Sequence, residues 1–170
     1  HVILLELIMG PTCSIIYENE PMEKNTMIQK PRPFTKTFFS WRELMTSVIQ
    51  GLAITAGTLT AYQMAVSDNL NENTTRAMVF TTLIASNIFL TLVNRSFYFS
   101  VLTTLKYKNN LVGLIIGITV ALTGVLLYLD PFTSFFQFES LNNNQLWTSI
   151  GIGFISVIWY ELVKGIKRGR

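Results

Sequence analysis

Five long apolar segments, separated by polar stretches, dominate this chain. They cover residues 1–17, 44–66, 77–94, 111–129 and 147–163. An α-helix rises about 1.5 Å per residue, so about 20 apolar residues cross the hydrocarbon core of a bilayer. The pattern therefore predicts an all-α fold, in which five transmembrane helices form one polytopic membrane domain, residues 1–170.

The positions of the basic residues orient the predicted helices. If the five segments cross the membrane alternately, twelve of the 13 Lys and Arg residues lie on one side, and only Arg76 lies on the other. Cytoplasmic loops retain Lys and Arg, whereas short translocated loops do not. We therefore predict an integral membrane protein, located in the plasma membrane, with a cytoplasmic C-terminus.

Composition narrows the classes of function. Hydrophobic residues make up 49% of the chain and charged residues 14%, which is too apolar for an ordinary soluble domain. The net charge of +3 comes from short basic stretches beside apolar segments, where anionic lipid headgroups lie, so nucleic acid is not an expected partner. A single cysteine, Cys13, can form neither an internal disulfide nor a metal cage.

The first apolar segment contains the strongest functional candidate. It places the carboxylate of Glu6 in apolar surroundings, and Gly10 and Pro11 follow. Proline has no N–H, so the carbonyl of Leu7 loses its partner and the helix is predicted to break at Gly10-Pro11. Free carbonyls beside a buried carboxylate suit a transported cation or a proton, and broken helices often form ion sites in transporters. Alternatively, Glu6 bonds to a neighbouring helix or extends to the membrane surface.

Other polar residues in the segments have structural alternatives. Asn87 is a second candidate ligand for the cation, although a hydrogen bond between helices is the favoured interpretation. Thr12 and Ser14 could line the unwound turn, but their hydroxyls more readily bond to helix carbonyls. Glu161 is expected to pair with Lys164 or with an arginine of a loop.

Small residues predict where helices approach closely. Gly113 and Gly117 form a GxxxG pair, for which close packing inside the bundle is favoured over a dimer interface. Trp147 is expected at the outer membrane interface, and Asp130-Pro131 is expected to end the helix before it.

Four stretches carry a resemblance to a known family. Leu-Glu-Leu-Ile-Met-Gly-Pro at residues 5–11 occupies the place of the family's Asn-Leu-Val-Thr-Asp-Gly-Leu-Pro, and residues 20–33 follow the spacing of its Pro-Pro, Ile-Met and Pro-Pro-Arg loop. Residues 127–147 contain Tyr-Leu-Asp-Pro and Gln-Leu-Trp, and residues 160–164 read Tyr-Glu-Leu-Val-Lys. In order and spacing, the chain resembles the last five of ten membrane helices of P-type cation-transporting ATPases of the calcium-pump type.

The resemblance implies what the whole protein does. Such enzymes couple ATP hydrolysis, through an aspartyl-phosphate and magnesium, to the movement of a cation across the bilayer. ATP and magnesium are thus expected for the full-length protein, with the remainder of the pump, the lipid bilayer and the cation as partners. This chain contains neither Asp-Lys-Thr-Gly-Thr nor a Gly-rich phosphate loop. By itself it is not expected to be an enzyme; it would supply one ion-site helix and four supporting helices.

Several positions depart from the family's pattern. Glu6 takes the position of the family's coordinating Asn, while Met9 and Gly10 replace its Thr and Asp. Ile84 stands where calcium pumps carry a glutamate. These departures suggest a changed stoichiometry, a different cation, or protons that move through Glu6.

The start of the chain fits a fragment of a longer protein. It lies inside an apolar segment, without an initiator methionine and without the basic region of a signal peptide. The rival hypothesis is a complete small membrane protein that scaffolds or assembles a complex without transport, and its reading frame would begin at or near His1.

Overall fold

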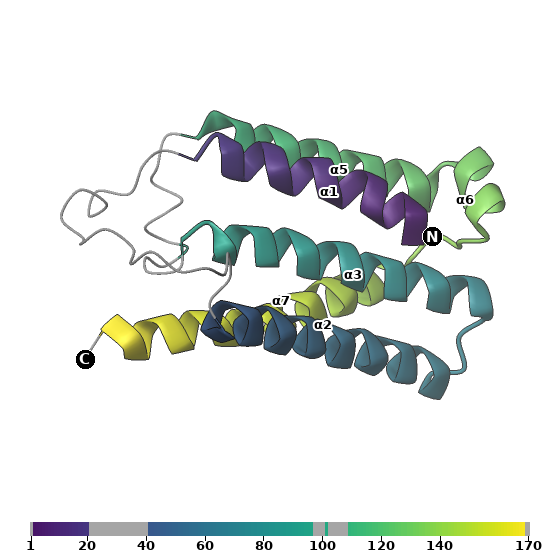
Figure 1. Ribbon diagram of the computed structural model, residues 1–170. Coiled ribbons are helices and arrows are strands. Elements are labelled where there is room, and N and C mark those ends of the chain that lie inside the picture. The colour runs from purple at the N-terminus through teal and green to yellow at the C-terminus, as the bar shows by residue number, and fades with distance from the viewer. Residues whose placement is uncertain (1, 21–40, 97–100, 102–108, 169–170) are drawn as a thin grey trace.

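The computed structural model describes residues 2–20, 41–96, 101 and 109–168. Over these residues the fold is all-α, as predicted, and no strand occurs (Figure 1). The helices are α1 (Val2–Glu18), α2 (Trp41–Ser67), α3 (Glu72–Asn94), α5 (Asn110–Tyr128), α6 (Asp130–Phe136) and α7 (Asn143–Arg168).

Helix α3 lies at the centre of the bundle. It separates α1 and α5, which pack together on one side, from α2 and α7 on the other (Figure 1). The long helices alternate in direction, so that the turn between α2 and α3 and the short helix α6 lie at one end, with the C-terminus at the opposite end. This alternation is the arrangement that the sequence predicts; which end faces the cytoplasm stays a prediction.

Four helices are long and apolar enough to cross a membrane. They are Glu43–Ser67, Glu72–Asn94, Leu111–Tyr128 and Asn143–Ile166, among the residues that the structure describes. The expected fifth span is not confirmed, because the described part of α1 has 17 residues. At about 1.5 Å per residue that length is roughly 26 Å, which is short of a hydrocarbon core of about 30 Å.

The predicted break at Gly10-Pro11 is wrong. Helix α1 runs without interruption from Val2 to Glu18, with Pro11 inside it. Proline removes one backbone hydrogen bond, but its fixed φ is compatible with a helix, and every further bond lost in lipid would be costly. The hydroxyl of Thr12 also donates to the carbonyl of Ile8, which confirms the expected back-bonding there.

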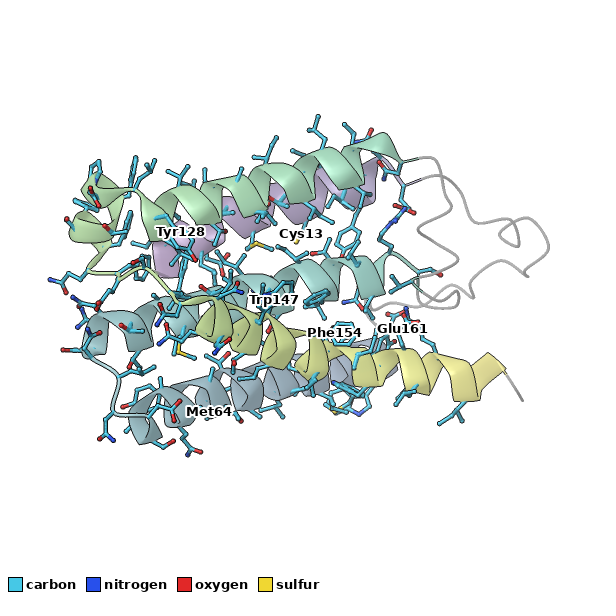
Figure 2. The ribbon with its side chains drawn as sticks, turned by 180° about the vertical axis from the view of Figure 1, so that it is seen from behind. Cys13, Met64, Tyr128, Trp147, Phe154 and Glu161 are labelled. Carbon is cyan, nitrogen blue, oxygen red and sulfur yellow. The ribbon has the colours of Figure 1, made fainter. Side chains whose placement is uncertain are left out.

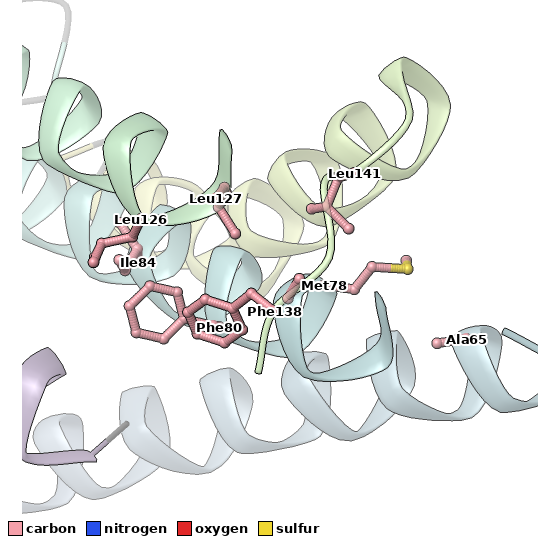
Figure 3. Packing of buried hydrophobic residues seen from close by; sticks show 9 residues of the cluster. Ala65, Met78, Phe80, Ile84, Leu126, Leu127, Phe138 and Leu141 are labelled. Carbon is pink, nitrogen blue, oxygen red and sulfur yellow. The ribbon is translucent and has the colours of Figure 1, made fainter. Parts of the chain in front are cut away.

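The main apolar cluster lies toward the end of the bundle that carries α6. It joins α2, α3 and α5 to the segment after α6 (Figure 3), through Ala65, Ala77, Met78, Phe80, Ile84, Leu126, Leu127, Phe138 and Leu141. The rings of Phe80 and Phe138 lie 5.0 Å apart between their centroids. The segment after α6 thus packs back onto the bundle through Phe138, while Phe135 of α6 stays exposed.

Glycine determines how closely α7 approaches its neighbours. A Cβ on Gly153 would lie 2.9 Å from the backbone nitrogen of Ser86 on α3, and a Cβ on Gly57 would lie 2.9 Å from the Cβ of Ser156 on α7. In contrast, nothing lies within 4 Å of a Cβ on Gly113 or Gly117. The predicted packing of this GxxxG pair inside the bundle is therefore wrong for the described residues.

Candidate functional site

Glu6 lies on the outward face of α1. Gly10 and Ser14, which follow at helical spacing, are exposed on the same face, whereas Met9 and Ile16 on the other side are buried. The described helices therefore do not enclose the carboxylate. A cation bound by Glu6 would take its other ligands from groups beyond these residues.

Asn87 does not join Glu6. Its side-chain amide donates to the carbonyl of Leu83 in its own helix at 2.9 Å, so the expected bond to another helix is wrong for the described residues. Ile84, which the resemblance aligns with a glutamate of calcium pumps, is buried in the main apolar cluster. The described part of the chain contains no group of three His, Cys, Asp or Glu residues that could hold a metal.

The C-terminal half of α1 is attached to α3 by polar contacts. The sulfur of Cys13 lies 3.0 Å from the hydroxyl oxygen of Thr91, and the hydroxyl of Tyr17 donates to the carbonyl of Thr91 at 3.4 Å. Figure 2 shows Cys13 between α1 and α3. Cys13 is partly buried and therefore packs against α3 as a small side chain.

A buried ion pair lies where α1, α3 and α5 meet. Arg95, which follows α3, donates to both carboxylate oxygens of Glu20, through Nε at 2.9 Å and Nη2 at 2.8 Å. The side chain of Arg95 is 2% exposed and that of Glu20 is 13% exposed. Asn109 donates to Glu20 at 3.1 Å and to the carbonyl of Ile16 at 3.3 Å, while its own oxygen caps α5 by accepting from the N–H of Leu111. One carboxylate thus holds three helix ends together.

The same end of α3 is also bonded to α2 and α7. Asn94 and Gln50 of α2 donate to each other's amide oxygens at 3.2 and 3.0 Å. Lys164 of α7, 1% exposed, donates to the carbonyl of Val93 and to Glu161, the latter at 2.8 Å. This confirms the expected pairing of Glu161, and a cation near the last carbonyls of α3 also fits the helix dipole.

We call this set of contacts the α3 junction. It comprises Val93, Asn94 and Arg95 with their partners Glu20, Gln50, Asn109, Glu161 and Lys164. Most of the α3 junction cannot be predicted from the sequence, because Arg95 is one of twelve basic residues that the charge pattern places on a single side. One signal for it is present in the sequence. Arg95 directly follows the polar Asn94 at the end of an apolar segment, and the opposite charge of Glu20 is predicted to lie at the same end of the bundle.

The four apolar helices describe an integral membrane protein, in which the carboxylate of Glu6 faces away from the described bundle. Comparison with known proteins defines the class further. Residues 1–166 match the family described as Cation transporting ATPase, C-terminus, and the chain belongs to this family. This match confirms the resemblance to the C-terminal region of P-type cation ATPases.

Individual relatives are distant. Calcium-transporting ATPase type 2C member 1 from Homo sapiens, from Mus musculus and from Pongo abelii each match with 23% identity over 151 residues. The aligned region is 89% of this chain but 16% of each relative. The chain therefore spans a small part of the length of the curated relatives that it matches.

Proposed function

We propose that this chain is the C-terminal transport domain of an ATP-driven cation pump, in which α1 supplies one ligand of the ion path. Membership of the cation-transporting ATPase family over residues 1–166 supports the pump. The observation that carries the site is the exposure of Glu6 within the apolar N-terminal half of α1.

The cost of a carboxylate in lipid explains why this face needs a partner. An ionised carboxylate in hydrocarbon is unfavourable unless a cation, a proton or hydrogen bonds compensate it. We infer that the face with Glu6, Gly10 and Ser14 meets other membrane helices of the same protein, and that a cation or a proton binds between them. The carbonyl of Leu7, which receives no bond from Pro11, is a further oxygen on this side.

Calcium is the first cation to test, because the relatives are calcium-transporting ATPases. Each is described as a calcium-transporting ATPase. The sites of the calcium-pump type are only partly present here, because Met9, Gly10 and Ile84 supply no carboxylate. We therefore propose either calcium with altered stoichiometry or protons as the transported ion. ATP and magnesium would act on cytoplasmic parts of the protein outside this chain.

The test compares Glu6→Gln with a matched variant of the same helix in the full-length protein. Glu18 is exposed at the end of α1, so Glu18→Gln removes an equal charge away from the proposed path. We expect Glu6→Gln to raise the calcium concentration for half-maximal ATP hydrolysis at least about tenfold, a loss of about 1.4 kcal/mol, or to shift its pH profile. Glu18→Gln and Asn87→Ala should change less. An unchanged calcium dependence and pH profile in Glu6→Gln would remove Glu6 from the ion path.

A further inference from the structure

Helix α1 is fixed much more firmly at one end than at the other. Its N-terminal half is held by apolar packing of Leu4, Leu5 and Ile8 on the main cluster. Such packing is not directional. The described hydrogen bonds from this helix to other helices, at Cys13, Tyr17 and the carbonyl of Ile16, all lie after Pro11.

The ion pair of Arg95 with Glu20 is the strongest of these constraints. A guanidinium that donates two parallel hydrogen bonds to one carboxylate fixes both the distance and the orientation of its partner. Because the pair is buried, salt screens it little. Asn109 holds the same carboxylate from the side of α5.

We propose that Arg95 is a positioning residue for the ion path: through Glu20 it fixes the rotation and depth of α1, and hence the direction in which Glu6 faces. This role rests on the proposed function. Pro11 lies between the anchored end and Glu6, and it is the place where a helix with a missing hydrogen bond bends most easily. The anchored half would keep its place on α3 and α5 while the half with Glu6 adjusts to the ion.

The rival explanation is that the pair only stabilises the fold. Removing one partner leaves the other charge buried and unpaired, so single variants such as Glu20→Gln destabilise under either explanation. Replacing both partners by apolar residues of similar size removes the directional contact between Arg95 and Glu20 without leaving an unpaired charge. Proteins often keep their stability when a buried ion pair is replaced in this way. The informative variant is therefore the double substitution Glu20→Leu with Arg95→Met.

The experiment uses the full-length protein, with calcium as the probe. We expect the double variant to keep its thermal unfolding midpoint, while the calcium concentration for half-maximal ATP hydrolysis rises at least about fivefold, the lower end of couplings between distant sites. Arg95→Lys keeps the positive charge but loses the two parallel hydrogen bonds of the guanidinium, and it should raise the calcium concentration for half-maximal hydrolysis by an intermediate amount. The control is the double variant Glu72→Gln with Arg76→Gln, which removes a partly exposed pair at the opposite end, together with the bond of Arg76 to Gln137, and should leave the calcium dependence unchanged.

Each result decides between the explanations. A stable double variant with unchanged calcium dependence overturns the proposal; if that variant fails to fold, an unchanged calcium dependence in Arg95→Lys does so. If calcium does not stimulate hydrolysis by the wild type, the calcium form of the proposed function fails. The positioning role is then measured by spin labels at Leu7 and Leu59, which are exposed on α1 and α2. With every native cysteine of the full-length protein, including Cys13, replaced by serine, the distance between the labels should shift or broaden in Arg95→Lys, and an unchanged distribution overturns the proposal.

Discussion

Two glycines on α7 show how a single position decides helix contact. Gly153 faces α3, where an added Cβ would lie 2.9 Å from a backbone nitrogen, whereas Gly151 has open space around its Cβ position. Both are glycines of one apolar segment, and the sequence does not distinguish them. The difference arises from the direction in which each faces, which packing against α3 determines.

Gly153→Ala should therefore destabilise the protein, because backbone cannot move aside as a flexible side chain can. Overpacking of this kind costs about 1–3 kcal/mol. Gly151→Ala is the matched control and should be neutral or stabilising, since alanine favours a helix by up to about 1 kcal/mol over glycine. Thermal unfolding of the full-length protein in detergent measures both, and equal midpoints would contradict the close contact of α3 with α7.

The candidate residues differ in how far the sequence could reveal them. Glu6 stands out because it is a carboxylate within an apolar segment, and such residues are often functional. Its outward direction could not be predicted, because it depends on which face of α1 meets α3 and α5. The partners Glu20 and Arg95 lie 75 positions apart, so only the folded arrangement brings them together.

At the scale of helices, the apolar pattern predicts where the long helices lie better than it predicts where they begin and end. The segment expected at residues 44–66 is helical from Trp41 to Ser67, and that at 147–163 is helical from Asn143 to Arg168. The helices extend past the apolar segments because backbone bonding continues beyond the hydrocarbon core. The short helix α6 was missed, although Pro131 in its first turn is a usual start signal.

The break predicted at Gly10-Pro11 overestimates the effect of these two residues on α1. Pro11 removes a hydrogen bond, but the neighbouring bonds of α1 remain and the helix continues. The GxxxG pair of α5 illustrates the same difficulty, since Gly113 and Gly117 meet none of the other helices that the structure describes. A local motif shows which contacts a helix can make. Whether the helix makes them depends on the helices that pack against it.

At the scale of the whole molecule, the α3 junction and the C-terminus lie at the same end of the bundle, opposite α6 (Figure 1). The excess of basic residues predicts that this end is cytoplasmic. If so, the junction lies on the side where we propose that the full-length protein hydrolyses ATP. Its contacts would then connect events at the cytoplasmic surface with the position of α1.

Cysteine labelling tests this orientation. With every native cysteine of the full-length protein, including Cys13, replaced by serine, single cysteines are introduced at Asn73, Asn144 and Asn19, all exposed. An impermeant thiol reagent added to sealed cells should label the first two, which lie near α6, and should not label Asn19→Cys. Permeabilised cells provide the control, in which all three react. Labelling of Asn19→Cys in sealed cells would reverse the orientation.

The central claim is that the full-length protein moves a cation with ATP along a path that includes Glu6. Calcium uptake into sealed inside-out vesicles tests it most directly. We predict uptake that requires ATP and magnesium and that falls at least about tenfold in Glu6→Gln, as a loss of about 1.4 kcal/mol would produce, with Glu18→Gln equal to the wild type. Uptake by Glu6→Gln equal to that of the wild type would contradict the role of Glu6. No ATP-dependent uptake of calcium or of any other cation by the wild type would contradict the pump itself.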